Sequence, residues 1–348
     1  MSEPIDSLGL REATFGLPEQ MAAAVRSLPV TGPLPDHDEI ANVLVLGTGA
    51  AGWAGALVEA VAGPFMPVPL VVHRGFEPPS FVDRSTLVIA ISASGDSPEV
   101  VASAGLCVEA GARLFAVTSG GQLGALADAN EAPTVFLPHA EAEAAVPRRA
   151  RIGALAVPVL LALDRLGLYP GGRDWIAAAI AQLKARRDEL SIDGNEAQRL
   201  ARAIGGTMPL VYGGGRVGGA AAQRWKAQLN QSAKLPSWTG ELPDVVHGEL
   251  AGWGQHGDIT RQVLSLVLLR HDDEPPAVAE QFALVEQWSE EVVSTILTVQ
   301  AAGEGALAQL LDLAFVGDVV ALELAAWAGI DPGPTPVIAA SPADAEAP

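Results

Sequence analysis

Cysteine and lysine are scarce in this chain of 348 residues, and acidic side chains outnumber basic ones. The single cysteine, Cys107, excludes an internal disulfide and a zinc site built from cysteines. Lysine and arginine total 21 against 41 aspartates and glutamates, which gives a formal net charge of −20. Because a surface of that sign repels nucleic acid and anionic membranes, we expect neither as a partner.

The sequence also lacks an N-terminal basic-then-apolar signal and a long uninterrupted apolar run. Its longest such run, residues 152–163, is too short to cross a bilayer and continues into Asp164 and Arg165. These features predict a cytoplasmic protein. The six histidines are scattered without the spacing of metal ligands, so we expect no metal and no other cofactor.

Short apolar runs alternate with helical segments over residues 39–168, where strands are predicted at 42–46, 68–73, 87–91, 113–118 and 134–137. Alternation at this spacing predicts a parallel, doubly wound sheet. The pattern returns over residues 205–335, with strands expected at 209–212, 262–270 and 292–299 and helices at 217–232, 276–288 and 304–328. We therefore predict the α/β class, with two flavodoxin-like, doubly wound parallel-sheet subdomains in tandem.

Three further segments complete the predicted organisation. Residues 1–38 are expected to form a helical arm, and residues 169–204 are expected to form linking helices between the subdomains. A tail rich in proline and alanine, residues 336–348, is expected to be disordered. An acidic stretch with Glu141 and Glu143 precedes the most basic run of the chain, residues 147–151.

A serine-rich turn between a strand and a helix, residues 87–99, organises the first subdomain. Its β-branched apolar run predicts a buried parallel strand, and Pro98 fits the first position of the helix that follows. Asp96 or Ser97 can cap this helix. Hydroxyl groups, a glycine and free backbone N–H groups thus meet at the positive end of a helix dipole, which suits a phosphate monoester. The alternative is an ordinary strand–loop–helix turn with polar caps.

This turn resembles the phosphate loop of SIS (sugar isomerase) domains, whose pattern S-x-S-G-x-[TS]-x-E ends here at Glu99. The turn at residues 47–52 resembles the family's G-x-G-G-S wall of the sugar site, with alanines in the last two places. It also matches a dinucleotide fingerprint, but His73 stands where an acidic residue should follow the next strand, so a tight turn is favoured over a nicotinamide site. The resemblance implies eight phosphate- or substrate-binding residues: Gly47, Gly49, Ala50, Ala51, Ser92, Ser94, Gly95 and Ser97.

The stretch 224–253 is the most specific part of the sequence. It resembles the bacterial and archaeal bifunctional phosphoglucose/phosphomannose isomerases, a SIS-domain family with the pattern R-W-K-x-Q-x-N-E-N-A-K-x-P followed by L-P-E-x-x-H-N-E-x-x-G. Matching residues are Arg224, Trp225, Lys226, Gln228, Asn230, Ala233, Lys234, Pro236, Leu242, Pro243, His247, Glu249 and Gly252. The segments 317–319 and 329–332 resemble the family's closing G-D-x-V and G-x-D-P, so the resemblance covers residues 40–335.

The resemblance implies isomerisation of glucose 6-phosphate or mannose 6-phosphate to fructose 6-phosphate through an enediolate. Arg149 takes the arginine place of the family's P-P-R-x-x-x-G pattern and would stabilise that anion, whereas the alternative is a solvated basic loop. His247 takes the place of the ring-opening histidine, against the alternative of a polar surface or hydrogen-bonded core histidine. The implied assembly is a homodimer in which each His247 enters the neighbour's pocket and a phosphorylated hexose is the ligand.

One position departs from the family pattern in a way that affects the chemistry. Gln231 stands where the family has its catalytic glutamate, and a carboxamide is a very weak base. The chain also has no lysine after Asp331, where the family has one. Either Glu249, Glu241 or Asp244 has taken over the base, or the chain is a phosphosugar-binding protein that acts as a sensor or as the partner of an active paralogue.

Overall fold

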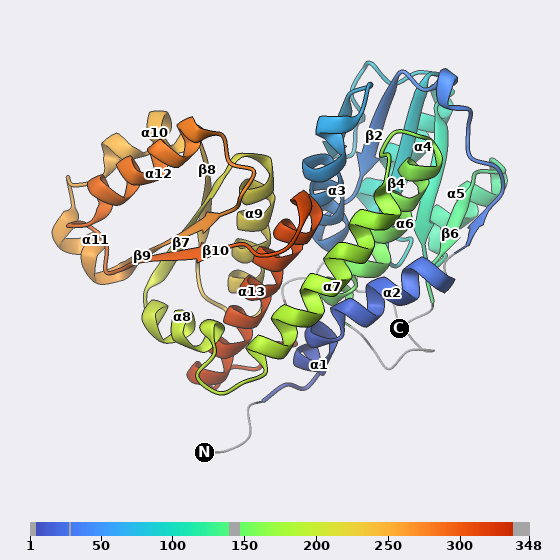
Figure 1. Ribbon diagram of the computed structural model, residues 1–348. Helices are drawn as coiled ribbons and strands as arrows, with labels where there is room; N and C mark the ends of the chain where they lie inside the picture. The colour runs from blue at the N-terminus through green and yellow to red at the C-terminus, as the bar shows by residue number, and fades with distance from the viewer. Residues whose placement is uncertain (1–4, 28, 139–146, 337–348) are drawn as a thin grey trace. The chain divides into compact units, whose positions relative to one another are not determined.

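The computed structural model describes residues 5–27, 29–138 and 147–336, which form two compact units (Figure 1). The N-terminal unit contains residues Gly16–Ile176, and the C-terminal unit contains Met1–Phe15 together with Ala177–Pro334. The predicted disordered tail lies outside the described residues except for residue 336, as does the acidic stretch with Glu141 and Glu143.

The N-terminal unit is built on a six-stranded sheet in the order β1-β6-β5-β4-β2-β3. Its strands are β1 (Val30–Thr31), β2 (Asn42–Leu46), β3 (Leu70–His73), β4 (Thr86–Ser92), β5 (Arg113–Thr118) and β6 (Thr134–Phe136). The short β1 runs antiparallel to β6, and the other pairs are parallel. The parallel strands have the flavodoxin-like order, which reverses direction between β2 and β4 and opens a crevice at their carboxyl ends.

Helices cover both faces of this sheet. Helices α4 (Pro98–Glu109) and α5 (Gly121–Ala129) share a buried core with one face of β2, β4 and β5. Cys107 lies in this core, and burial raises the pKa of its thiol to about 11. Helix α3 (Gly49–Ala62) packs on the opposite face through Gly55, which contacts Val45 and Val72. Helix α6 (Ile152–Arg165) packs against α3, and α2 (Leu17–Ser27) packs against α6.

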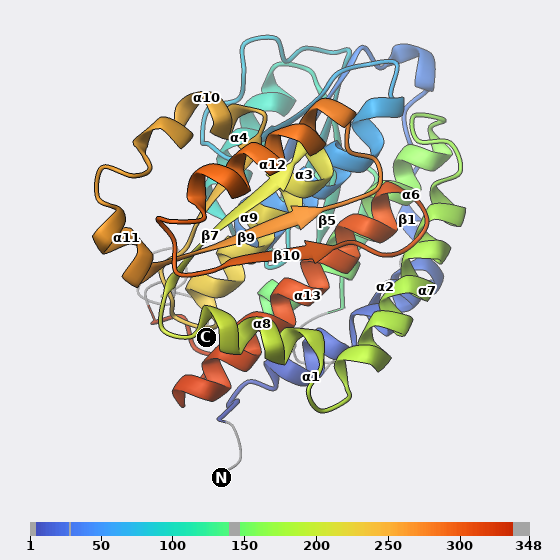
Figure 2. The ribbon, with the colours of Figure 1, turned by 60° about the vertical axis from the view of Figure 1, so that its left-hand side comes forward.

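The C-terminal unit repeats the architecture with a four-stranded parallel sheet in the order β10-β9-β7-β8. Its strands are β7 (Met208–Gly214), β8 (Trp238–Leu242), β9 (Leu264–Arg270) and β10 (Ile296–Gln300). Helix α12 (Pro276–Ser289) covers one face, and α9 (Gly215–Gln231) covers the other (Figure 2). The long helix α13 (Gly305–Ala328) packs against α9, α8 (Glu196–Ile204) and α1 (Leu10–Phe15). The predicted fold class is confirmed.

Several element boundaries differ from those predicted. Strand β8 was not anticipated, because its sequence WTGEL lacks an apolar run and most of its residues are exposed or half-buried. Residues 262–263, expected in a strand, end the short helix α11 (Gly257–Val263), and the strand expected from residue 292 begins at Ile296. Helices α7 (Gly172–Leu190) and α8 both lie in residues 169–204, which were expected to form linking helices.

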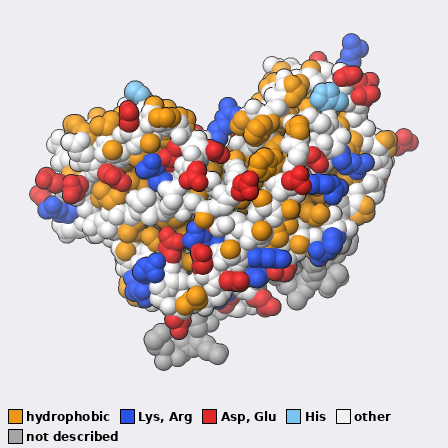
Figure 3. Space-filling model, viewed as in Figure 1, with side chains coloured by type: hydrophobic (Ala, Val, Ile, Leu, Met, Phe, Trp, Pro, Cys, Tyr) orange, Lys and Arg blue, Asp and Glu red, His pale blue; other side chains and the backbone are white. Residues whose placement is uncertain are grey.

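Helix α13 is the most apolar long helix of the described residues. By length and composition alone it could cross a membrane. In the structure 89% of the most apolar 18-residue stretch of this helix is buried inside the protein, where the helix packs beside α9. Acidic and basic side chains alternate over the face of the molecule drawn in Figure 3.

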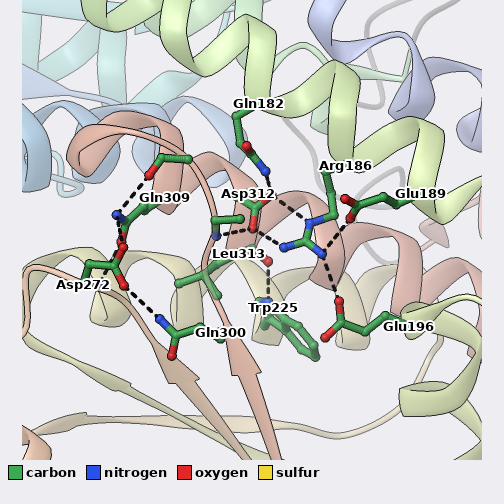
Figure 4. Close-up of polar contacts among 12 residues, drawn as sticks. Gln182, Arg186, Glu189, Glu196, Trp225, Asp272, Gln300, Gln309, Asp312 and Leu313 are labelled. Atoms are coloured by element: carbon green, nitrogen blue, oxygen red, sulfur yellow. Dashed lines mark hydrogen bonds and ion pairs between the residues drawn. The ribbon is translucent and has the colours of Figure 1, made fainter.

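A network of charged side chains lies buried between α7 and α13 in the C-terminal unit (Figure 4). The fully buried carboxylate of Asp312 accepts hydrogen bonds from Nε and Nη2 of Arg186 at 2.8 and 2.7 Å and from Gln182 Nε2 at 2.8 Å. The bond to Asp312 is the main cause that raises the pKa of Arg186. Two further carboxylates contact the guanidinium, those of Glu189 and Glu196.

We expect Asp312→Ala to lower the free energy of unfolding by about 3–5 kcal/mol, because it leaves the buried Arg186 without its main counter-ion. The control is Asp188→Ala, which removes an exposed carboxylate 3.4 Å from Arg187 and should cost less than about 1 kcal/mol. Urea unfolding followed by circular dichroism measures both. A loss for Asp312→Ala no larger than that of the control would contradict this account of the network.

Candidate functional site

The serine-rich loop lies at the carboxyl edge of the N-terminal sheet. It follows β4, which pairs with β2 on one side and β5 on the other. The crevice where the strand order reverses is therefore next to this loop, and open α/β sheets bind their ligands at such a crevice.

Serine hydroxyls and backbone N–H groups are paired inside this loop. The buried Ser92 Oγ accepts from the N–H of Gly95 at 3.1 Å and lies 3.0 Å from Ser97 Oγ. Ser94 Oγ accepts from the N–H of Asp96 at 3.3 Å. The loop thus gathers the three predicted serines around two main-chain amides, and each of these amides is bonded to a serine hydroxyl.

Gly95 gives the loop its shape. Its φ angle is +84°, and a Cβ at this position would overlap the carbonyl oxygen of Gly120. Its own carbonyl accepts from the N–H of Leu123 at 2.8 Å, at the start of α5. Glycine is required here both by conformation and by the close approach of the next loop.

Of the two residues predicted to cap α4, Ser97 occupies the N-cap position. Asp96 caps the neighbouring helix α5 instead, since its Oδ1 accepts from the N–H of Gln122 at 2.9 Å. Pro98 occupies the first turn of α4 as expected. Within the described part of the chain, Ser97 makes no side-chain capping bond to α4. The N-terminus of α4 is therefore left without a side-chain cap and can meet an anion.

The turn after β2 is tight and lies beside the serine-rich loop. A Cβ on Gly52 would come within 2.7 Å of the carbonyl oxygen of Gly47, so the two glycines let the strand end and the helix start touch. Between them, the hydroxyl of Thr48 donates to Oε1 of Glu99 in the first turn of α4. This bond joins the two turns across the crevice.

The remaining predicted residues of this turn begin helix α3. Gly49 has a φ of +54° and is exposed, Ala50 is half-buried, and Ala51 is buried. All three lie in the first turn of α3, on the side of the crevice opposite α4. The turn therefore forms a wall of small side chains, and it offers no hydroxyl beyond that of Thr48.

Arg149 belongs to the same unit. It lies in the short turn η3 (Arg148–Ala150), is half-buried, and this turn contacts α3. Gln20 fixes the turn by donating from Nε2 to the carbonyl of Ala150 at 3.0 Å. The N-terminal unit thus holds the serine-rich loop, the glycine turn and the predicted arginine.

His247 and Glu249 lie at the carboxyl edge of the C-terminal sheet. Strand β8 ends at Leu242, which pairs with Gly214 at the end of β7, and α10 (Asp244–Gly248) follows. His247 is exposed on α10. The carboxylate of Glu249 accepts a hydrogen bond from the hydroxyl of Tyr212 at 2.8 Å.

Gln231 lies at the other edge of that sheet. It ends α9, which starts at the carboxyl end of β7 and runs back for 17 residues, about 25 Å. Ser237, six residues later, donates to the carbonyl of Pro209 at the start of β7. One copy of this unit therefore does not bring Gln231 and His247 together.

Much of the resemblance over 224–253 belongs to the core. The guanidinium of Arg224 donates to both carboxylate oxygens of Asp318 at 2.8 and 2.7 Å, and the pair is buried. Trp225 is fully buried, donates to the carbonyl of Leu313, and packs on Gly317, where a Cβ would overlap its ring. These shared residues hold α9 against α13.

Two residues of the candidate site were missed from the sequence. Thr48 could have been found as the one hydroxyl residue in the glycine turn, next to the expected phosphate loop. Tyr212 gave no such signal, since a tyrosine in an apolar strand usually fills the core. Among the described residues no cluster of three or more His, Cys, Asp or Glu could hold a metal ion.

Comparison with known proteins agrees with this geometry. Residues 193–341 match the family model of the bacterial phospho-glucose isomerase C-terminal SIS domain. The bifunctional phosphoglucose/phosphomannose isomerase of Caldicellulosiruptor bescii is 26% identical over 327 residues, which cover 93% of this chain and 95% of that protein. The protein of the same name from Aquifex aeolicus is 27% identical over 275 residues, which cover 78% and 79%.

A solved structure shares the fold of the whole chain. The C-terminal domain of glucosamine-fructose-6-phosphate aminotransferase from Francisella tularensis superposes with a TM-score of 0.71 at 13% identity, and the match covers 94% of this chain and 98% of that one. At that identity the likeness shows the fold alone. The chain is thus similar in sequence to bifunctional phosphoglucose/phosphomannose isomerases over most of its length, and its residues 193–341 match the C-terminal SIS domain of bacterial phospho-glucose isomerases.

Proposed function

We propose that this chain binds a phosphorylated hexose and interconverts its aldose and ketose forms. The observation that carries the proposal is the serine-rich loop at the reversal point of the first sheet, beside a helix N-terminus without a side-chain cap. The relatives named as phosphoglucose/phosphomannose isomerases over most of the chain support the reaction class.

The reaction passes through an enediolate whose negative charge needs a fixed cation. Arg149 supplies that cation. His247 opens the sugar ring by passing the proton of the anomeric hydroxyl to the ring oxygen as the bond between C1 and that oxygen breaks. Glucose 6-phosphate and mannose 6-phosphate differ only at C2, which is planar in the enediolate. One pocket therefore serves both sugars, with fructose 6-phosphate as the common ketose.

The resemblance to the family favours a site shared between two copies of the chain. Gln231 and His247 occupy opposite edges of the C-terminal sheet, so one copy does not bring the family's glutamate position and its histidine position together. We propose a cytoplasmic homodimer in which His247 of one copy enters the pocket of the other, because a twofold axis supplies each pocket with the same missing residue.

Because Gln231 stands where the family has its glutamate, another residue must act as the base. The carboxamide of Gln231 cannot accept the C2 proton at neutral pH, whereas the carboxylate of Glu249 lies at the edge that carries His247. Glu249 is therefore our candidate base, ahead of Glu241 and Asp244. The second candidate function, a phosphosugar sensor or partner of an active paralogue, is favoured by the same glutamine.

We expect fructose 6-phosphate to bind more weakly when hydroxyls of the serine-rich loop are removed. Ser94→Ala and Ser97→Ala should each raise the dissociation constant for fructose 6-phosphate by about tenfold or more, because each removes a hydrogen bond to a dianion. Isothermal titration calorimetry measures this, with Ser191→Ala as a control at an exposed serine of the C-terminal unit. Unchanged affinity in both loop variants would refute the phosphate site.

Gln231→Glu distinguishes the two candidate functions, with Gln287→Glu on the exposed face of α12 as the control for added charge. Turnover of mannose 6-phosphate is followed in a coupled assay. If the wild-type chain binds without turnover and Gln231→Glu restores it by about a hundredfold or more, the chain is a binding protein. If the wild-type chain is active and Gln231→Ala leaves it so, the base lies elsewhere and Glu249→Gln should abolish activity.

The shared sites predict a homodimer by light scattering. They also predict that mixing two inactive variants, Ser97→Ala with Ser94→Ala in one chain and His247→Ala in the other, restores about a quarter of the wild-type activity. Half of the dimers are then mixed, and each holds one intact site. A monomer that still binds the sugar phosphate, or no recovery after subunits exchange, would contradict the shared site.

A further inference from the structure

His247 lies between two anchored points of the C-terminal unit. Before it, Val245 is buried against the ring of Tyr212, and Gly240 of β8 leaves room for both side chains. After it, Leu250 is buried in the same core cluster. The exposed histidine is thus the outermost part of a short segment, residues 244–253, whose two ends are held on the sheet.

The hydroxyl of Tyr212 fastens the second end of this segment. Tyr212 is fully buried in the central strand β7, and its hydroxyl donates to Oε2 of Glu249 at 2.8 Å. The side chain of Trp253 lies close enough to the same hydroxyl to lower its pKa, against the effect of burial. Two side chains that follow His247 therefore meet one phenol.

The phenol keeps its proton across the neutral range. Burial is the largest cause that raises the pKa of Tyr212, and the negative charge of Glu249 raises it further. A protonated hydroxyl is a hydrogen-bond donor, so the phenol remains able to donate to Glu249 in this range. We call this bond the tether.

We propose that Tyr212 is a positioning residue for His247. Through Glu249 and Trp253 it fixes the segment 244–253 on the rigid sheet, and this sets the place at which the imidazole meets the ring oxygen of a hexose phosphate. The proposal rests on the proposed function for the substrate that His247 meets. The tether itself is a property of the C-terminal unit and can be measured without a substrate.

A ligand-free test follows the imidazole by NMR. The Cε1–H signal of His247 is assigned by its loss in His247→Ala and recorded between pH 5 and pH 9. Tyr212→Phe and Glu249→Ala, which remove the donor and the acceptor, should both shift and broaden this signal. Glu249→Gln keeps an acceptor oxygen for the phenol and should leave the signal near its wild-type position.

Tyr169→Phe is the matched control. Tyr169 is the other tyrosine of the chain, is also buried, and belongs to the N-terminal unit. The Tyr169→Phe substitution should therefore leave the His247 signal unchanged. Thermal unfolding of every variant separates loss of position from loss of fold, since a tethered loop can move while the melting temperature stays within a few degrees of the wild type.

Kinetics then separate the tether from the proposed function. In an active chain Tyr212→Phe should lower kcat by about tenfold with KM unchanged, because the serine-rich loop proposed to bind the phosphate is not altered. An unchanged His247 signal and unchanged kcat in Tyr212→Phe would overturn the tether and leave the isomerase proposal intact. A shifted signal in a chain that neither binds nor converts hexose phosphates would support the tether and overturn the proposed function.

Discussion

The hydrogen bond from Thr48 to Glu99 joins the two turns on which the candidate site depends. These turns follow β2 and β4, the neighbouring strands between which the sheet order reverses. Gly95 and Gly52 allow each turn to approach the backbone of another segment, so the shape of the crevice is set by contacts that any larger residue would break. Under the proposed function, a strongly acidic protein binds a phosphate here because hydroxyls and backbone N–H groups meet its charge locally.

The C-terminal unit imposes a second constraint, which comes from topology. In a β–α–β unit the helix returns the chain to the starting edge of the sheet, so α9 carries Gln231 away from the edge where β8 later delivers His247. Only 16 positions separate the two residues in the sequence. Their separation across the sheet leaves Glu249, and not the residue at position 231, in the segment that carries His247.

The sequence predicted the fold class, most helices and strands, and the serine loop, because these depend on local patterns. The run before Ser92 is apolar and β-branched, and Pro98 marks the helix start. The rest depends on neighbours that the sequence does not reveal. Asp96 caps a helix that begins 25 positions later, since β4 and β5 are adjacent, and Arg224 and Trp225 matched a family pattern although they serve the core.

The most direct test of the account is a crystal structure of the chain with fructose 6-phosphate bound. We expect the phosphate to lie in the loop formed by Ser92, Ser94 and Ser97, at the N-terminus of α4, with C1 and C2 of the sugar directed away from the loop. A structure that leaves this crevice empty while the sugar phosphate binds elsewhere, or a crevice that accepts a nucleotide instead, would contradict it.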